Sequence, residues 1–257
     1  MPSEITSRDN ERVKYARRVA ASAEARREEG VFFAEGLRLC LDLAQNVRPQ
    51  TVFVTEALLE ERPELETLGV ETFLVKDGVA QKLAETRSPQ GLFCLFATPA
   101  AAQSALRCED GVLLCEAMQD PANVGAVVRS AAGLGFGGVV FTHGSADAFG
   151  PKALRAGMGS VLRLPVLQGA DTKETVLALR GAGVRWYAAA APADSLAAHR
   201  ADKKPPFGLM IGNEGAGLVP DSMAMADERL HVPMRAGVES LNAAAAAAVL
   251  MYEMKRP

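Results

Sequence analysis

The amino-acid sequence predicts an α/β protein built from two domains in succession. Short apolar segments that fit β-strands alternate with helical segments along nearly all of the 257 residues, which is typical of α/β folds. Residues 98–104, rich in small side chains and containing a proline, interrupt this alternation and have the composition of a linker. We therefore expect a first domain at 1–98, a linker at 99–107 and a second domain at 108–257.

Composition narrows the class of protein. A hydrophobic content of 49% with 23% charged residues is ordinary for a soluble globular chain, and the net charge of −3 gives no global attraction to nucleic acid. No apolar run approaches the ~20 residues that span a bilayer, and the N-terminus lacks a signal-peptide pattern. Cys40, Cys94, Cys108 and Cys115 lack metal-ligand spacing. We expect a cytoplasmic protein with reduced thiols, no metal and no membrane contact.

The first domain begins with a strongly charged helical segment at 8–29. Strands are expected at 31–33, 51–54, 72–75 and 92–97, with helices at 37–45, 56–66 and 79–85 between them. Lys14, Arg17 and Arg18 share one face of the first helix by their i, i+3, i+4 spacing. A solvated helix face is the usual meaning of such a run, and contact with a nucleic-acid phosphate backbone is the more specific alternative.

The second domain alternates in the same way. Its strands are expected at 112–116, 139–142, 162–167, 185–189, 208–211 and 230–232, and its helices at 124–134, 151–158, 173–182, 195–201, 220–226 and from about 240 to 254. Strands this apolar favour a mostly parallel sheet covered on both faces. Because ligands bind beyond the carboxyl ends of such strands, we expect the chemistry in the loops that follow Glu116, Thr142, Ile211 and Val232.

The first of these loops leads into a helix. Asn123 fits its N-cap, and Gly125 allows close approach to its first turn. Arg129 is a cation within an otherwise apolar helix, so it needs an anionic partner or a position at the edge. A structural salt bridge and an active-site role are both open for it.

The second loop, 212–218, reads Gly-Asn-Glu-Gly-Ala-Gly-Leu. Three glycines around Asn213 and Glu214 suit a backbone that wraps closely around a ligand, whereas a plain glycine-rich turn would not explain the Asn-Glu pair. By contrast, the G-x-G-x-x-G spacing at 133–138 ends a helix and leads into a strand. A dinucleotide fingerprint has the opposite context.

The last loop follows a short strand that Pro233 ends. Glu239 or Ser240 fits the cap of the final helix, whose alanine run at 243–248 leaves one face flat enough for close packing. Glu239, Ser240 and Asn242 lie between apolar elements and must find partners in the protein or in a ligand. An ordinary capped helix is an equally good interpretation of this stretch alone.

Three motifs in this order resemble the SpoU-type (TrmH-like) RNA ribose 2′-O-methyltransferases of the SPOUT superfamily. They are Asn123-x-Gly125-x-x-x-Arg129, the 212–218 loop, and Val232-Pro-Met with Ser240-Leu-Asn242. The N-terminal part resembles the L30e-like substrate-binding domain of many members, through Ile-Thr-Ser at 5–7, Asn10, Lys14, Phe-x-Glu-Gly at 33–36 and Ser-Pro-Gln-Gly at 88–91. Ala244 and Gly157 depart from the family, which often has serine there.

The resemblance implies a small L30e-like α/β domain followed by a SPOUT α/β domain with a C-terminal trefoil knot. It implies S-adenosylmethionine as the cofactor, held between the loops at 212–218 and 232–242, and a homodimer with the final helix in its interface. The implied cofactor-binding residues are Gly212, Asn213, Gly217, Leu218, Val232, Pro233, Ser240 and Leu241. The implied catalytic residues are Asn123, Arg129, Glu214 and Asn242, with RNA contacts by Lys14, Arg17 and Arg18.

The implied reaction is transfer of a methyl group from a sulfonium to a ribose 2′-oxygen, with ribosomal RNA the preferred substrate and transfer RNA the alternative. A guanidinium is a poor base, so we expect Arg129 to clamp phosphate and stabilise a developing alkoxide. The rival interpretations are an RNA-binding protein without catalysis, which the intact polar motif residues disfavour, and a small-molecule methyltransferase, which the first domain disfavours. A generic nucleotide-binding enzyme lacks a fingerprint in the right context.

Overall fold

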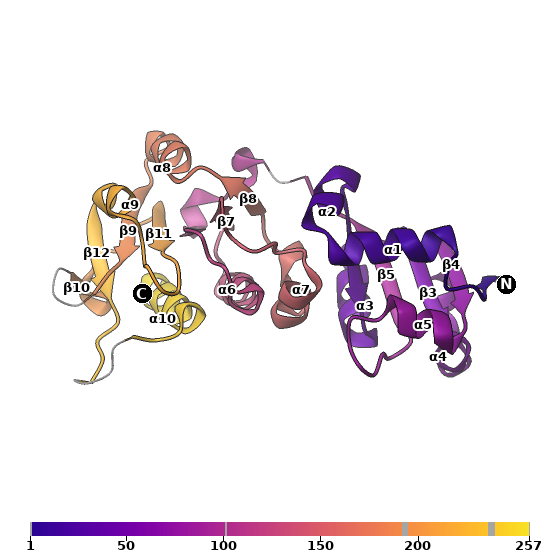
Figure 1. Ribbon diagram of the computed structural model, residues 1–257. Coiled ribbons are helices and arrows are strands. Elements are labelled where there is room, and N and C mark those ends of the chain that lie inside the picture. Colours follow the sequence, from indigo (N-terminus) through magenta and orange to yellow (C-terminus); the bar gives the residue numbers. More distant parts are fainter. Residues whose placement is uncertain (1, 101, 192–194, 236–239, 257) are drawn as a thin grey trace. The chain divides into compact units, whose positions relative to one another are not determined.

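The structure, a computed structural model, describes residues 2–100, 102–191, 195–235 and 240–256 (Figure 1). Its contacts divide the chain into two compact units. The first unit is Met1–Ala100 with Phe149–Leu162, and the second is Ala101–Ala148 with Arg163–Pro257. The segment Phe149–Leu162 lies in sequence inside the predicted second domain, yet its contacts group it with the first unit. There the ring of Phe149 lies 5.2 Å from that of Phe32.

The first unit contains a mixed five-stranded sheet in the order β1-β4-β3-β5-β2. Its strands are β1 (Ser3–Ile5), β2 (Val31–Glu35), β3 (Thr51–Thr55), β4 (Glu71–Val75) and β5 (Leu92–Ala97). β4 pairs in parallel with β1 and β3, whereas β5 runs antiparallel to β2 and β3. The sequence predicted four of the five strands. β1 escaped notice because it has three residues, of which only Ile5 is buried.

Most helices of this unit are shorter than predicted, and the one predicted at 79–85 is shifted by two residues toward the N-terminus. The helices are α1 (Glu11–Ala21), α2 (Ala23–Glu29), α3 (Leu37–Ala44), α4 (Glu56–Glu61), α5 (Asp77–Leu83) and α7 (Pro151–Gly157). The predicted helix 8–29 is two helices, because Ser22 has extended backbone and its side chain caps α2 by accepting from the Ala25 N–H. The predicted helix 56–66 ends at Glu61, and a 3₁₀ turn, Pro63–Thr67, follows it.

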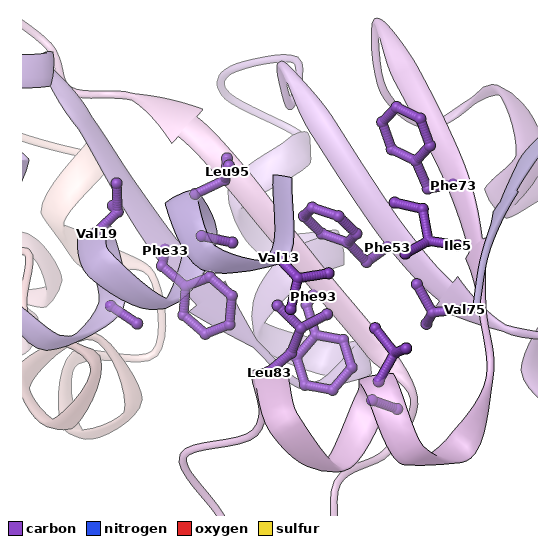
Figure 2. Close-up of a cluster of buried hydrophobic side chains, with 14 of the residues drawn as sticks. Ile5, Val13, Val19, Phe33, Phe53, Phe73, Val75, Leu83, Phe93 and Leu95 are labelled. Atoms are coloured by element: carbon purple, nitrogen blue, oxygen red, sulfur yellow. The ribbon is translucent and has the colours of Figure 1, made fainter. Parts of the chain in front are cut away.

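One core of the first unit lies between the sheet and α1. Figure 2 shows Phe33, Phe53 and Phe93 of three neighbouring strands meeting Val13 and other apolar side chains of the helices. Val13, Ala16 and Val19 are fully buried, so the apolar stripe of α1 is covered and its charged face points outward.

The second unit contains a seven-stranded sheet in the order β10-β12-β9-β11-β6-β7-β8. Its strands are β6 (Val112–Cys115), β7 (Gly138–Thr142), β8 (Val166–Ala170), β9 (Arg185–Ala189), β10 (Leu196–Ala197), β11 (Phe207–Ile211) and β12 (Glu228–His231). All of these neighbours pair in parallel, which confirms the predicted sheet type. Because β6 and β11 are central neighbours, the loops after them leave the same edge of the sheet together.

Helices cover both faces of this sheet (Figure 1). α8 (Thr172–Gly181) and α9 (Pro220–Ala224) lie on one face, and α6 (Pro121–Gly133) and α10 (Ala243–Lys255) pack together on the other. The burial of both faces explains why the strands β6, β7 and β11 are buried along their whole length and almost entirely apolar.

Two predictions of secondary structure in this unit are wrong. The helix expected at 195–201 is the short strand β10 followed by a 3₁₀ turn, Ala198–Arg200, because pairing with β12 outweighs local helix propensity. The strand expected at 162–167 begins only at Val166, after a 3₁₀ turn, Ser160–Leu162, and Pro165. The predicted trefoil knot depends on the chain path through 192–194 and 236–239, which lie outside the described residues, so it stays a prediction.

The four cysteines are free thiols, and Cys40, Cys94 and Cys115 are buried whereas Cys108 is partly exposed. Burial raises the pKa of Cys94 and of Cys115 well above the ordinary value, which suppresses thiolate reactivity. Among the described residues, no helix is both long and apolar enough to cross a membrane.

Candidate functional site

Four segments meet beyond the carboxyl ends of the central strands of the second unit. The loop after β6 is tied to the loop after β7, since the Ala117 N–H donates to Thr142 Oγ1 at 3.0 Å and the Met118 N–H to Ser145 Oγ at 3.1 Å. It is tied to the loop after β11 through Glu214, and α6, which follows it, is tied to the start of α10 by the bond from Asn242 to Asn123. The structure thus gathers residues from all three sequence motifs at one edge of one sheet.

The loop at 212–218 folds back on itself. Asn213 and Gly217 exchange two backbone hydrogen bonds of 3.0 Å, and Asn213 Oδ1 accepts from the N–H groups of Gly215 and Ala216. A Cβ on Gly212 would lie 2.1 Å from backbone atoms of Gly217 and Leu218. Only glycine fits there, so Gly212 is required by the closure of the loop, whose shape is held by its own hydrogen bonds.

A directional chain of side-chain hydrogen bonds joins the three motifs. Asn242 Oδ1 accepts from the N–H groups of Ala244 and Ala245, so its amide nitrogen is the end that donates to Asn123 Oδ1, at 3.0 Å. Asn123 in turn donates through Nδ2 to Glu214 Oε1, also at 3.0 Å. Each amide orientation fixes the next, and the chain ends on a carboxylate that can only accept.

Glu214 collects further donors. Its carboxylate accepts from the N–H groups of Gln119 and Asp120, each at 3.2 Å. Partial burial by itself raises the pKa of Glu214, but the hydrogen bonds from Asn123 and from backbone N–H groups outweigh it and lower the pKa below 4.5. A carboxylate whose oxygens are occupied in this way anchors the loop and is poorly placed to take a substrate proton.

The helix caps differ from those predicted. Asp120, not Asn123, caps α6 by accepting from the Ala122 N–H, with Pro121 at the first helical position. Asn242, not Ser240, caps α10, and Glu239 lies outside the described residues. Asn123 is therefore free to use its whole side chain in the chain of hydrogen bonds.

Arg129 lies at an exposed edge of α6. Within the part of the chain that the structure describes, its guanidinium has neither a hydrogen bond nor an ion pair. The sequence left two alternatives for Arg129, an anionic partner or a position at the edge of the helix, and the structure shows the edge position. An exposed guanidinium without a partner is available to bind an anion.

A cavity of ≈ 510 Å³ opens between the 212–218 loop and the last segment of the chain. Of the eight residues expected to bind the cofactor, seven line it, and Pro233 does not. Glu214 lines it as well, whereas Asn123, Arg129 and Asn242 do not. The lining residues are Ala189–Ala191, Ile211–Leu218, Met223, Leu230–Val232, Met234, Ser240, Leu241, Ala243, Ala246 and Leu250.

Sequence reasoning missed three parts of this region. The alanines at 189–191 and His231 line the cavity from the ends of β9 and β12, and His231 Nδ1 lies 2.9 Å from Ser195 Oγ. Glu116 is 8% exposed and directly follows β6, with three hydrogen-bond donors around its carboxylate. A carboxylate at the end of a wholly apolar strand was the signal that could have revealed it.

The predicted RNA-binding residues lie in the first unit, and each is paired with an acid. Lys14 Nζ lies 2.8 Å from Glu11, Arg17 pairs with Glu85, and Arg18 pairs with Glu29. The spacing of the three cations on α1 does place them on one face, as predicted, and that face carries compensating carboxylates.

The second unit is an all-parallel α/β unit with a cavity beyond its strand ends, and the first is a mixed-sheet α/β unit. These features define a two-domain ligand-binding protein. Its site gathers three separate sequence motifs. The chain belongs to the SpoU rRNA Methylase family, whose model matches residues 110–252. The MRM3-like substrate binding domain model matches residues 10–94.

Named relatives agree with this family. The chain is 31% identical to the 23S rRNA (guanosine(2553)-2′-O)-methyltransferase RlmP of Bacillus subtilis, over 98% of this chain and 99% of the relative. It is 28% identical to the human mitochondrial rRNA methyltransferase 3, over 93% of this chain and 70% of that protein.

Solved structures are similar over almost the whole chain. The AdoMet-bound rRNA methyltransferase of Sinorhizobium meliloti has a TM-score of 0.86 at 26% identity, covering 98% of this chain and 97% of that one. The SpoU methyltransferase AviRb of Streptomyces viridochromogenes, in complex with AdoMet, has a TM-score of 0.86 at 27% identity, covering 96% and 97%.

Proposed function

We propose that this protein transfers a methyl group from S-adenosylmethionine to a ribose 2′-hydroxyl of ribosomal RNA. The observation that carries the proposal is the self-closed 212–218 loop, which borders a cavity beyond the parallel strands. The relatives of the chain include an rRNA 2′-O-methyltransferase and AdoMet-bound structures. Because ribosomal RNA is the proposed substrate, we also propose that the protein acts in the cytoplasm. The human relative is named as a mitochondrial protein.

The cavity fits the cofactor in size and chemistry. Its volume lies within the range of small-molecule sites, and its alanine and leucine side chains suit an apolar ring. The loop backbone and the side chain of Ser240 supply polar groups for the nitrogen-bearing edges of the cofactor's ring system, while the side chain of Asn213 is engaged in holding the loop. We assign Gly212, Asn213, Gly217, Leu218, Val232, Ser240 and Leu241 to this role, with Pro233 shaping the chain beside it.

The bound cofactor supplies an electrophilic methyl group on a sulfonium, so the protein's task is to position and activate the ribose hydroxyl. Arg129 offers a permanent positive charge to the neighbouring phosphate and to the developing alkoxide. The proton leaves to a phosphate oxygen or to water, since guanidinium has no acceptor. Asn123, Glu214 and Asn242 hold the motif loops together, a positioning role.

The first unit contributes RNA contacts by this proposal. Lys14, Arg17 and Arg18 exchange their carboxylate partners for phosphate oxygens when RNA binds. The exchange costs little for Lys14 and Arg18, whose side chains are exposed to water, and more for Arg17, whose ion pair is half-buried. We also propose a homodimer through α10, which exposes Tyr252 at 56% and Val249 at 39%.

The test is transfer of labelled methyl from S-adenosylmethionine to unmodified ribosomal RNA and transfer RNA, run beside Arg129→Ala. We expect ribose-linked label in ribosomal RNA, and a loss of at least about a hundredfold in the variant with cofactor affinity unchanged. Label in transfer RNA alone would reassign the substrate. Loss of cofactor binding together with transfer would contradict the role given to Arg129.

A further inference from the structure

A buried carboxylate that has no part in the proposed reaction lies beside the 212–218 loop. Glu116 follows β6 and is 8% exposed. Its backbone N–H donates to the Ile211 carbonyl at 2.8 Å, immediately before the 212–218 loop. Its side chain therefore starts from the strand end that lies against the entry to that loop.

Three donors from two segments, the start of α8 and the start of α9, converge on this carboxylate. The Val219 N–H donates to Oε2 at 2.9 Å, and the hydroxyls of Thr172 and Ser222 donate to Oε1, the former at 2.9 Å. Within the described residues the carboxylate contacts no cation. A buried carboxyl group held only by neutral donors depends on each of them, and each donor depends on the carboxyl group.

The bond to Val219 bears on the cavity. Val219 follows directly after Gly217 and Leu218, which both line the cavity, whereas neither Glu116 nor Thr172 lines it. Fixing the Val219 N–H therefore fixes the exit of the loop. Thr172 is the first residue of α8, so its bond to the same carboxylate does not touch the loop.

The entry of the loop is held by the next residue along. Ala117 has a φ of 49°, a left-handed conformation that costs a non-glycine residue about 1 kcal/mol. In this conformation its carbonyl accepts from Asn213 Nδ2 at 2.8 Å while its N–H donates to Thr142 Oγ1. Two consecutive residues thus hold the two ends of one loop, and local strain at such a position accompanies function.

Resting on the proposed function, we propose that Glu116 is a positioning residue for the cofactor: through the Val219 N–H it sets the exit of the 212–218 loop and so the shape of the cavity. It touches neither the reacting atoms nor the cofactor. Its loss weakens cofactor binding while leaving the chemical step intact once the cofactor is bound.

Three variants separate this role from general stabilisation. Glu116→Ala removes all three bonds. Glu116→Gln keeps an oxygen for the Val219 N–H, while its amide nitrogen faces the hydroxyls of Thr172 and Ser222, which both turn round to accept. Thr172→Val removes one bond to the same carboxylate, from a segment outside the cavity. Should Glu116→Ala not fold, Glu116→Asp replaces it, because its shorter side chain withdraws from Val219.

Affinity for S-adenosylmethionine is measured by calorimetry, kcat at saturating cofactor by methyl transfer, and stability by thermal unfolding. We expect Kd to rise about tenfold in Glu116→Ala and to stay within about threefold in Glu116→Gln, with kcat unchanged in both. In Thr172→Val we expect a lower melting temperature and a Kd within about twofold of wild type.

Equal cofactor affinity in wild type and Glu116→Ala overturns the role of Glu116 alone. The role of Glu116 is also overturned if the Kd of Thr172→Val rises as far as that of Glu116→Ala. A fall in kcat of Glu116→Ala with its Kd unchanged overturns it as well. Absence of cofactor binding by the wild-type protein overturns the proposed function itself, and this inference with it.

Discussion

At the scale of single residues, each side chain in the hydrogen-bond chain of the site fixes the orientation of the next. Asn242 caps α10 with its oxygen, which commits its nitrogen to Asn123, and Asn123 then commits its own nitrogen to Glu214. The arrangement is consistent only while Glu214 is an acceptor. Ionisation of Glu214 is therefore coupled to the stability of the motif loops.

This coupling predicts a pH dependence. Because the folded-state pKa of Glu214 is below 4.5, its stabilisation is fully present above the unfolded-state pKa and is lost as pH falls through the folded-state pKa. Glu214→Gln, which sets an amide against the N–H donors, is expected to lower the free energy of unfolding at pH 7 by about 1 kcal/mol, since the side chain is open to water. Urea unfolding from pH 7 to pH 3 should show the difference from wild type shrinking; a constant difference contradicts the coupling.

At the scale of elements, α1 presents opposite properties on its two sides. Val13, Ala16 and Val19 are fully buried on one side, while Lys14, Arg17 and Arg18 on the other are paired with carboxylates. The pairing keeps the face close to neutral until a stronger anion replaces the acids. Phosphate contacts by such a face add affinity without sequence preference.

Replacing Lys14, Arg17 and Arg18 together by alanine is expected to weaken RNA binding and to reduce the salt slope of log K by about 2 to 3. Affinity is measured by filter binding across a salt series. The matched control replaces Arg12, Arg27 and Arg62, three other cations of the first unit, of which Arg12 lies on the opposite side of α1. Equal losses of RNA affinity in the two triple variants would show a general effect of charge. They would contradict the assignment of an RNA-contacting face to Lys14, Arg17 and Arg18.

At the scale of the whole molecule, α10 has a buried side and an exposed apolar side. Ala247, Leu250 and Met251 are buried within the second unit, where α10 packs on α6. Val249 and Tyr252 remain exposed. Large apolar side chains on the outside of a helix that borders the cavity support the proposed homodimer through this helix.

Glutamate at both Val249 and Tyr252 is expected to raise the dimer dissociation constant about a hundredfold or more, because a buried interface would then hold unpaired charges. Sedimentation velocity or light scattering across a concentration series measures the change. Leu177→Glu, at a 52% exposed position on α8, is the control. A wild-type protein that is monomeric at all concentrations contradicts the proposed dimer.

The sequence by itself determined the fold class and most of the strands. Buried parallel strands are continuous apolar runs, as in β6, β7 and β11, so composition alone marks them. It failed where a partner far along the chain decides the structure: β1 needs β4, and β10 needs β12, before either is stable as a strand. The predicted helix ends were wrong at Ser22, Asp120 and Asn242. Several polar residues near each end could serve as the cap, and only the path of the backbone selects one.

The sequence also identified Asn123, Glu214 and Asn242 as residues of interest, through motifs, but not what they do to one another. Asn123 is 91 residues from Glu214 and 119 from Asn242. Only the parallel neighbours β6 and β11, with α10 packed on α6, bring them together. Glu116 needed the tertiary structure for the same reason: its donors lie 56, 103 and 106 residues away, and a hydrogen bond, unlike a hydrophobic period, has no signature in local sequence.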